Sequence, residues 1–189
     1  MTSVTIIGTG NMGQAIAGLA TKGGHAVELL GSGDAGQPVT GELVVLAVPH
    51  AALADVLGQR GAELDGKVVV DITNPVDFAT FSTTAPADGS AADAVAGALP
   101  GARVLKAFNT TFAATLASGS VGDLPTTVLI AGDDDEAKAL LAGVVESAGL
   151  KALDAGPLRR ARELEALALL QIALAVQGKI EWTKGFAVV

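Results

Sequence analysis

A glycine-rich turn near the start of the chain carries the most specific chemical signal. Gly8, Gly10 and Gly13 follow an apolar, β-branched run, precede a helical pattern and fit the spacing G-x-G-x-x-G. In this motif the glycines permit a tight turn, the approach of a pyrophosphate to backbone N–H groups, and close helix packing. The helix N-terminus adds the positive end of its dipole. The turn predicts a dinucleotide site made by Gly8, Thr9, Gly10, Asn11, Met12 and Gly13.

Further residues are predicted at the same crevice because each follows an apolar, strand-like run, and ligands of open parallel sheets bind outside the carboxyl ends of the strands. These residues are Ser32, Ala47, Val48, Pro49, His50, Thr73, Asn74, Pro75, Phe108, Asn109 and Thr110. The set is rich in amides and hydroxyls and poor in acid–base groups, which favours positioning two rings for hydride transfer over hydrolysis.

His50 is the one candidate proton donor in that set. The alternative for His50 is an exposed residue at a helix start. For Asn74 and Asn109, the alternative is a role in local turns, where an asparagine side chain satisfies nearby backbone groups. The residues themselves leave these alternatives open.

Composition narrows the range of partners. The net charge of -8 argues against nucleic acid or an anionic membrane as the main partner. The chain has no cysteine, which excludes disulfides and thiolate chemistry, and its two histidines disfavour a histidine-rich metal centre. The first strand begins within a few residues of Met1, and no apolar run is long enough to span a bilayer. We therefore expect a cytoplasmic protein that binds small molecules and no metal.

Strand-like and helical segments alternate along the chain, which predicts an α/β fold of the Rossmann type with a doubly wound parallel sheet. The predicted strands are 4–7, 25–30, 43–48, 67–72, 103–107, 127–131 and 150–153, and the predicted helices after the first are 51–60, 91–99, 112–118, one ending at Ala148, and 158–177. Between strands two and three, Gly31 to Gly41 has no room for the usual helix and strand. The third strand is therefore expected to pair with the first, on the side away from the second.

Residues 1–154 are predicted to form the dinucleotide-binding domain, and residues 155–189 a small helical segment. The last helix is apolar nearly all round from Ala166 to Val176, which predicts burial against a twofold partner in a homodimer. Its polar start is interpreted as arginine–glutamate pairs within the helix. Asp133 is predicted to cap the N-terminus of the helix that ends at Ala148, with Glu136 completing a capping box. The C-terminal tail, with Trp182, is expected to pack over a pocket.

Several motifs together resemble the NADP oxidoreductase family that depends on the deazaflavin coenzyme F420. They are GTGNMGQAIA from Gly8, Val48-Pro49, KAFNT from Lys106, AGDDDEAK from Ala131 and LDAGPL from Leu153. KAFNT is also similar to the oxidoreductase domain of the STEAP metalloreductases. The resemblance implies a Rossmann domain with a small helical C-terminal part, a homodimer, and hydride transfer between a nicotinamide and a deazaflavin or flavin.

The resemblance also implies residue roles. Thr9, Asn11 and Met12 would contact the pyrophosphate and Ser32 the 2′-phosphate of NADP, while Val48, Pro49 and Asn74 would line the nicotinamide. Asn109 and Thr110 would stand where the second ring stacks, as the catalytic residues. Gly33 replaces the arginine of the family, so a small preference for NADP over NAD is expected. Asn109 stands where the deazaflavin enzymes can carry histidine, so the second ring is either deazaflavin or flavin.

Two other functions fit the same crevice. The first is reduction of a small carbonyl or imine, which would require a well-placed proton donor. The second is a non-catalytic sensor that binds NAD(P) and reports redox state through its dimer. Turnover with any acceptor would separate the sensor from both enzymes.

Overall fold

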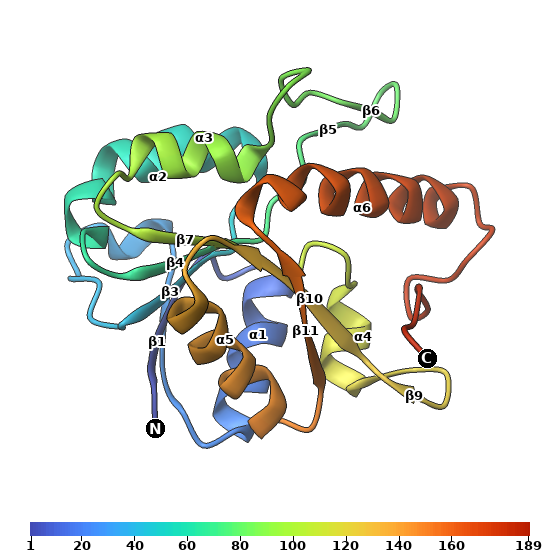
Figure 1. Cartoon of the computed structure of the whole chain (residues 1–189), viewed down its shortest axis with the longest axis horizontal. Coiled ribbons are helices and arrows are strands. Elements are labelled where there is room, and N and C mark those ends of the chain that lie inside the picture. Colours follow the sequence, from blue (N-terminus) through green and yellow to red (C-terminus); the bar gives the residue numbers. More distant parts are fainter.

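The computed structural model describes all 189 residues and places seven strands in one sheet, in the order β11-β10-β7-β4-β3-β1-β2 (Figure 1). The strands are β1 (Ser3–Ile7), β2 (Ala26–Leu30), β3 (Leu43–Leu46), β4 (Val68–Asp71), β7 (Arg103–Lys106), β10 (Thr127–Gly132) and β11 (Lys151–Gly156). The five strands from β2 to β7 in this order are parallel. The Rossmann-type α/β fold predicted from the sequence is confirmed.

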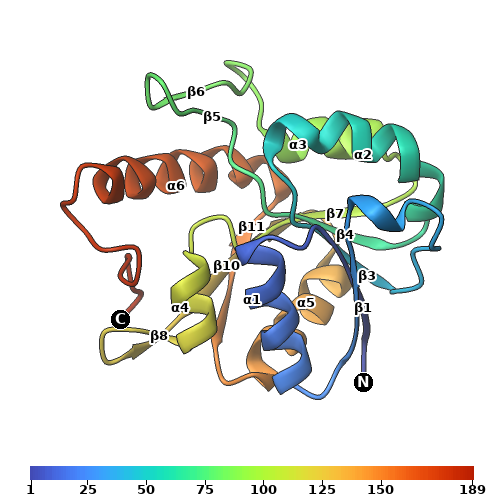
Figure 2. The ribbon, with the colours of Figure 1, turned by 180° about the vertical axis from the view of Figure 1, so that it is seen from behind.

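Helices cover both faces of this sheet. They are α1 (Asn11–Lys22), α2 (Leu53–Arg60), α3 (Ala91–Ala98), α4 (Ala113–Ser118), α5 (Asp135–Ser147) and α6 (Ala161–Val176). Figure 2 shows α1 and α4 side by side with α5 beyond them, whereas α2 and α3 lie on the opposite face. The α6 helix begins beside α3 and extends away from it (Figure 1).

Alternate residues of the central strands enter two hydrophobic cores. In β3, Leu43 and Val45 belong to the core under α1 and α5, whereas Val44 and Leu46 belong to the core under α2 and α3. All four residues of β3 and all four of β4 are buried. Strands covered on both faces require apolar residues at every position, and this explains the unbroken apolar runs in the sequence.

The last two strands of the sheet differ from the fully parallel arrangement that we expected. β10 runs antiparallel to β7 and pairs with it only through Ala131 and Gly132, and β11 lies parallel to β10. Residues 107–126 connect β7 to β10 through α4 and a small hairpin, and β10 ends beside the carboxyl end of β7.

The stretch between β2 and β3 contains only a 3-10 turn, η1 (Ser32–Asp34). As predicted, β3 pairs with β1 on the side opposite to β2. Arg60, at the end of α2, is 6 % exposed, and its guanidinium donates to the carbonyl oxygens of Asp34 and Gln37. One buried side chain therefore holds the short crossover against the domain.

Two local predictions need correction. Asp134, one residue after the predicted cap, accepts the N–H of Ala137 at the start of α5, while Asp133 accepts the N–H of Leu158 at the start of η4 (Leu158–Arg160). In a run of acidic residues, neighbouring side chains can each cap the same helix. Because Asp133 binds the N–H of Leu158, Asp134 is the residue that caps α5. The predicted strands also omit a small antiparallel hairpin, which pairs β5 (Val76–Asp77) with β6 (Ser82–Thr83). A second small hairpin joins β8 (Ser120–Val121) to β9 (Leu124–Pro125).

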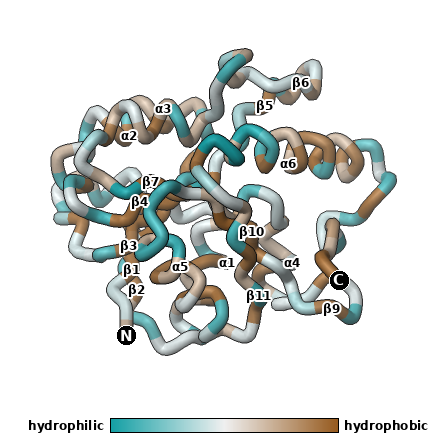
Figure 3. Tube along the Cα trace, viewed as in Figure 1, coloured by the Kyte–Doolittle hydropathy of each residue, from teal (hydrophilic) through white to brown (hydrophobic).

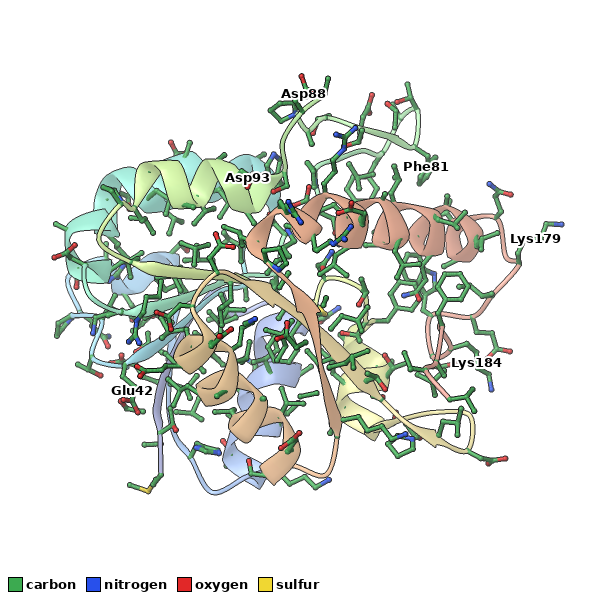
Figure 4. All side chains as sticks on the ribbon, viewed as in Figure 1. Glu42, Phe81, Asp88, Asp93, Lys179 and Lys184 are labelled. Atoms are coloured by element: carbon green, nitrogen blue, oxygen red, sulfur yellow. The ribbon has the colours of Figure 1, made fainter.

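The α6 helix buries polar residues and exposes apolar ones. Figure 3 shows its hydrophilic first turn and its more hydrophobic remainder. Glu165 and Gln171 are buried, while Leu170 is 53 % and Val176 49 % exposed. Figure 4 places Phe81 of the hairpin beyond one side of α6 and Lys184 of the C-terminal segment beyond the other. None of the helices combines the length and hydrophobicity needed to cross a bilayer.

Candidate functional site

The turn between β1 and α1 has the geometry of an anion-binding cradle. Gly8 has a φ of +121°, and a Cβ there would collide with the carbonyl oxygen of Ala47. A Cβ at Gly13 would collide with the carbonyl oxygen of Gly8. At Gly10, by contrast, no atom of the chain lies within 4 Å of the place a Cβ would occupy. No side chain caps α1, so the N–H groups of its first turn can bind an anion over Gly10.

A cavity of about 430 Å³, here called the Ser32 cavity, lies on the β2 side of this turn. Its lining includes Gly8, Thr9, Gly31, Ser32, Val48, Pro49, Ala52, Asp55, Gln59 and Arg60. Ser32 is exposed, and Gly33 beside it has open space around its Cβ position. The guanidinium of Arg60 is occupied by carbonyl groups of the crossover and is not directed as a fork at a ligand.

A second cavity, the Asn109 cavity, has a volume of about 480 Å³ and lies on the other side of the turn. Its lining is Asn11, Met12, Ile72, Asn74, Phe78, Asn109, Thr111, Phe112, Ala113, Ala114, Ile172 and Trp182. None of these side chains is ionisable. The two cavities share the first turn of α1 as their border, since Thr9 lines one and Asn11 the other.

Asn74 and Asn109 form a pair at the base of this cavity. The Nδ2 of Asn74 donates to the backbone oxygen of Asn109 at 3.1 Å, and the Nδ2 of Asn109 donates to the Oδ1 of Asn74 at 3.0 Å. The Oδ1 of Asn109 is buried and has no partner. The pair therefore joins the segments that follow β4 and β7, and it leaves one amide oxygen unsatisfied beside the cavity.

Phe108 fixes the direction of the chain before Asn109. Its φ is +60°, a left-handed conformation that a bulky residue rarely adopts and that costs on the order of 1 to 3 kcal/mol. The ring is 1 % exposed and belongs to the core under α1, so burial offsets that cost. The strained turn directs Asn109 toward Asn74.

The C-terminal segment closes the Asn109 cavity. The ring of Trp182 lies 4.8 Å from that of Phe112, between centroids, at an interplanar angle of 53°. Gln171 of α6 donates to the carbonyl oxygen of Thr110 and accepts the N–H of Phe186. Gln171 thus ties the tail to the segment that carries Asn109, and the expectation that the tail packs over a pocket is confirmed.

The structure brings most of the predicted site residues together but separates two of them. His50 lines another groove, between α2 and α3, with neighbours such as Leu57 and Val95. Its Nδ1 has no hydrogen-bond partner. Thr110 is 9 % exposed and does not line the Asn109 cavity, whereas Thr111 does.

Three of the remaining predicted residues line one of the two cavities. Val48 and Pro49 line the Ser32 cavity, and Asn74 lines the Asn109 cavity. Ala47, Thr73 and Pro75 line neither: Ala47 contacts Gly8, and Thr73 and Pro75 are buried. The residues predicted to line the nicotinamide, Val48, Pro49 and Asn74, therefore lie in both cavities.

Sequence reasoning missed a buried ionic cluster beneath this region. Lys106 bridges Asp71 and Glu165, at 2.8 Å and 2.7 Å. Glu165 is therefore not part of the predicted intrahelical pairs, although Arg160 and Glu163 do pair, at 3.2 Å. The available signal was a charged residue at the end of each of two apolar strands, with Asp71 ending β4 and Lys106 ending β7.

Ion pairs outside the crevice shift the ionisation of their members. Hydrogen bonds with Asp154 and then Asp135 raise the pKa of Lys138, and the hydrogen bond from Lys138 lowers the pKa of Asp154. A hydrogen bond from the backbone of Ala79 lowers the pKa of Asp77. Lys138 joins α5 to β11 at the surface and lines neither the Ser32 cavity nor the Asn109 cavity. No group of three or more His, Cys, Asp or Glu side chains is arranged to share a metal ion.

Known proteins resemble this chain in sequence and in structure, although no protein-family model matches it. It is 30 % identical over 148 residues to the F420-dependent NADP reductase of Methanocaldococcus jannaschii, a match covering 76 % of this chain and 66 % of that protein. Its fold matches a crystal structure of a candidate F420-dependent NADP reductase from Arthrobacter sp. FB24, with a TM-score of 0.86, 25 % identity and complete coverage of both chains. The chain is related to the F420-dependent NADP reductases.

The family resemblance inferred from the motifs is thereby confirmed. The similarity to the STEAP proteins is found as well, since the chain is 36 % identical over 107 residues to the metalloreductase STEAP3 of Rattus norvegicus, covering 57 % of this chain and 21 % of that protein. The chain spans about two thirds of the length of the curated F420-dependent NADP reductases that it matches.

Proposed function

We propose that this protein transfers a hydride between a nicotinamide dinucleotide, with NADPH preferred over NADH, and a deazaflavin such as coenzyme F420 or a flavin. One observation carries the proposal. A cavity with an exposed serine and a cavity lined by apolar and amide groups meet at the uncapped N-terminus of α1. The curated relatives named as F420-dependent NADP reductases support the same reaction.

The dinucleotide is proposed to lie across the glycine turn. Backbone N–H groups of the first turn of α1 would hold the pyrophosphate over Gly10, where the chain leaves open space. Ser32 and Thr9 would hydrogen-bond the 2′-phosphate in the Ser32 cavity. Without a free arginine beside Ser32, the preference for NADPH over NADH is small.

The acceptor ring is proposed to occupy the Asn109 cavity. A flat conjugated ring would pack between the first turn of α1 and the aromatic wall of Phe112 and Trp182, with Asn109 beneath it. A hydride carries both electrons and its own proton, so the transfer itself requires positioning and no proton from a side chain. Reduction of a carbonyl or imine does require a proton donor, and no carboxyl, imidazole, amine or phenol group lines this cavity.

Stopped-flow oxidation of NADPH by coenzyme F420, with flavin mononucleotide in parallel, tests the reaction. Trp182 is the only tryptophan and the chain has no tyrosine, so its fluorescence reports directly on the Asn109 cavity. We expect quenching by the acceptor and NADPH oxidation at saturating acceptor. Binding of NADPH without turnover by either acceptor would favour the sensor and contradict the proposal.

We also propose that two copies associate through the exposed apolar side of α6. Leu170 and Val176 are about half exposed, and single-chain packing leaves this side uncovered. Leu170→Glu should convert a dimer into a monomer, as measured by light scattering at micromolar concentration, because it places a charge in the contact. Leu153→Glu, at a 45 % exposed leucine on β11, is the matched control and should leave the dimer intact. A wild-type monomer would disprove the proposal.

A further inference from the structure

Two exposed aromatic side chains border the Asn109 cavity. Phe78 is 66 % exposed and Trp182 is 50 % exposed, and both line the cavity. Apart from the first and last residues of the chain, no large apolar side chain is more exposed than Phe78. Aromatic surface that is gathered at a cavity and left in water is the kind of surface that a ligand covers.

The two aromatic residues belong to segments on opposite sides of α6. Phe78 follows β5 in the small hairpin, and Trp182 lies in the C-terminal segment. Figure 4 shows Phe81 of the hairpin beyond one side of α6 and Lys184 of the C-terminal segment beyond the other. Ile172 of α6 also lines the cavity. The cavity therefore extends from the hairpin, past α6, to the C-terminal segment.

Hydrogen bonds of Asp77 hold the backbone of Phe78 in a tight turn. The carboxylate of Asp77 accepts the N–H of Ala79 at 2.8 Å and the hydroxyl of Thr80 at 2.8 Å. The backbone oxygen of Asp77 accepts the N–H of Phe81. These bonds close the chain around Phe78, so its backbone is fixed although its ring is exposed.

A strained residue supports the ring of Phe78. Phe81 has a φ of +51°, a left-handed conformation that bulky residues rarely adopt. Phe108 offsets a similar strain by burial in the core, but Phe81 belongs to neither hydrophobic core. The ring of Phe81 instead meets that of Phe78 edge-on, with centroids 6.4 Å apart and an interplanar angle of 84°. Backbone strain of this kind gathers at ligand sites.

Resting on the proposed function, we propose that Phe78 contacts the fused ring of the acceptor at the hairpin end of the Asn109 cavity, while Trp182 contacts it at the other end. The ring covers aromatic surface that otherwise faces water. Only a flat acceptor that reaches both residues gains this contact, and a small carbonyl or imine leaves one of them exposed. Phe78 therefore determines specificity for deazaflavins and flavins, and Phe81 positions it.

Phe78→Ala tests the contact, with the fluorescence of Trp182 reporting acceptor binding. We expect the Kd for flavin mononucleotide, and its KM in turnover, to rise about tenfold because one aromatic contact is lost. The Kd for NADPH should stay within about twofold, and the melting temperature within about 2 °C, because the ring is exposed. Phe78→Tyr keeps the ring and should restore wild-type acceptor binding.

Lumiflavin, which has the flavin ring without the phosphate-bearing side chain, identifies the part of the acceptor that Phe78 contacts. Phe78→Ala should weaken the binding of lumiflavin and of flavin mononucleotide by the same factor. A loss confined to flavin mononucleotide would overturn the inference, because Phe78 would then contact the side chain of the acceptor and not its ring.

Phe81→Gly tests the positioning role of Phe81. Glycine adopts a positive φ without strain, so the variant should be at least as stable as the wild type. Loss of the supporting ring should nevertheless raise the Kd for both acceptors about two- to threefold, with NADPH binding unchanged. An unchanged acceptor Kd would show that Phe81 does not position Phe78.

Leu153→Ala is the matched control, because Leu153 is 45 % exposed on β11 and lines neither cavity. Its acceptor binding should equal that of the wild type. If Phe78→Ala binds both acceptors as the wild type does, or loses NADPH affinity to the same extent, the inference is wrong while wild-type turnover leaves the proposed function standing. Wild-type protein that binds NADPH but neither these flavins nor coenzyme F420 would overturn the proposed function itself, so the two failures are distinguishable.

Discussion

The Ser32 cavity is built from the first third of the chain, whereas the Asn109 cavity is lined by residues from Asn11 to Trp182. At the first, the lining residues all lie within residues 7–60, and most of the crossover beside them is exposed. At the second, α1, the ends of β4 and β7, α4, α6 and the tail converge over a buried ionic cluster. If the dinucleotide and the acceptor bind as proposed, recognition of the dinucleotide depends on the first third of the chain, while recognition of the acceptor depends on the whole tertiary structure.

A bulky side chain in the Asn109 cavity should give the largest effect, because it should block turnover and leave NADPH binding unchanged. Ala114 is exposed and lines this cavity, so Ala114→Trp would place an indole where the acceptor ring lies. Turnover should fall by about 100-fold or more because the rings lose their reacting geometry, while the Kd for NADPH stays within about twofold. Stopped-flow rates and calorimetry measure the two effects. Ala117→Trp, on the same helix and outside the cavity, should retain activity, and equal losses in both variants would contradict the assignment.

Substitution of Gly10, among the turn glycines, should act mainly on dinucleotide binding. Gly10→Ala meets no atom of the chain, so the melting temperature should change by only about 2 to 4 °C, whereas the affinity for NADPH should fall about tenfold or more because the methyl group occupies the path of the pyrophosphate. Gly13→Ala should instead destabilise the fold, since its Cβ would strike the Gly8 carbonyl. Unchanged NADPH affinity in Gly10→Ala would place the pyrophosphate elsewhere.

Gly33→Arg should strengthen the Ser32 cavity and leave the acceptor side unaffected. The position is exposed with open space around it, and a guanidinium can form charge-assisted hydrogen bonds to a 2′-phosphate worth about 1.5 to 3 kcal/mol. Affinity for NADPH should rise about tenfold while affinity for NADH stays constant, as measured by calorimetry. Gly36→Arg adds the same charge to the same loop and is the control. A wild type that prefers NADH would contradict the role of Ser32.

His50→Ala should have the smallest effect, because His50 lies in the groove between α2 and α3 and lines neither cavity. The rate of hydride transfer should change by less than about tenfold, and its pH profile should keep its shape. Stopped-flow measurements across pH test this expectation. A larger loss would indicate that His50 donates a proton, and carbonyl or imine reduction would then become the better assignment.

Patterns among residues close in sequence predicted much of the fold and the glycine turn that borders the Ser32 cavity. The glycine turn, the buried strands and the missing helix after β2 are all consequences of neighbouring residues. Even the pairing of β3 with β1 followed from the length of one short segment. These features depend on backbone sterics and on hydrophobic periodicity, which are visible within about 20 residues.

The remaining features depend on contacts between distant residues. Glu165 was assigned to arginine–glutamate pairs within its own helix, yet it pairs with Lys106 and accepts the N–H of Ala91. His50 follows the end of β3 as expected, but the turn η2 (His50–Ala52) directs its side chain into another groove. The direction of β10 is seen only in the pairing of Ala131 and Gly132 with the distant end of β7. No local pattern encodes such geometry.

The crossover held by Arg60 also bears on how this fold can change. Residues 35–38 are exposed, so an insertion at Gly36 would displace no packed element, and each doubling of a flexible loop costs only about 0.6 kcal/mol. A longer segment could therefore be added there to wall the Ser32 cavity without altering either hydrophobic core. Cofactor choice is thus separable from folding, and it can be evolved or engineered within one surface loop.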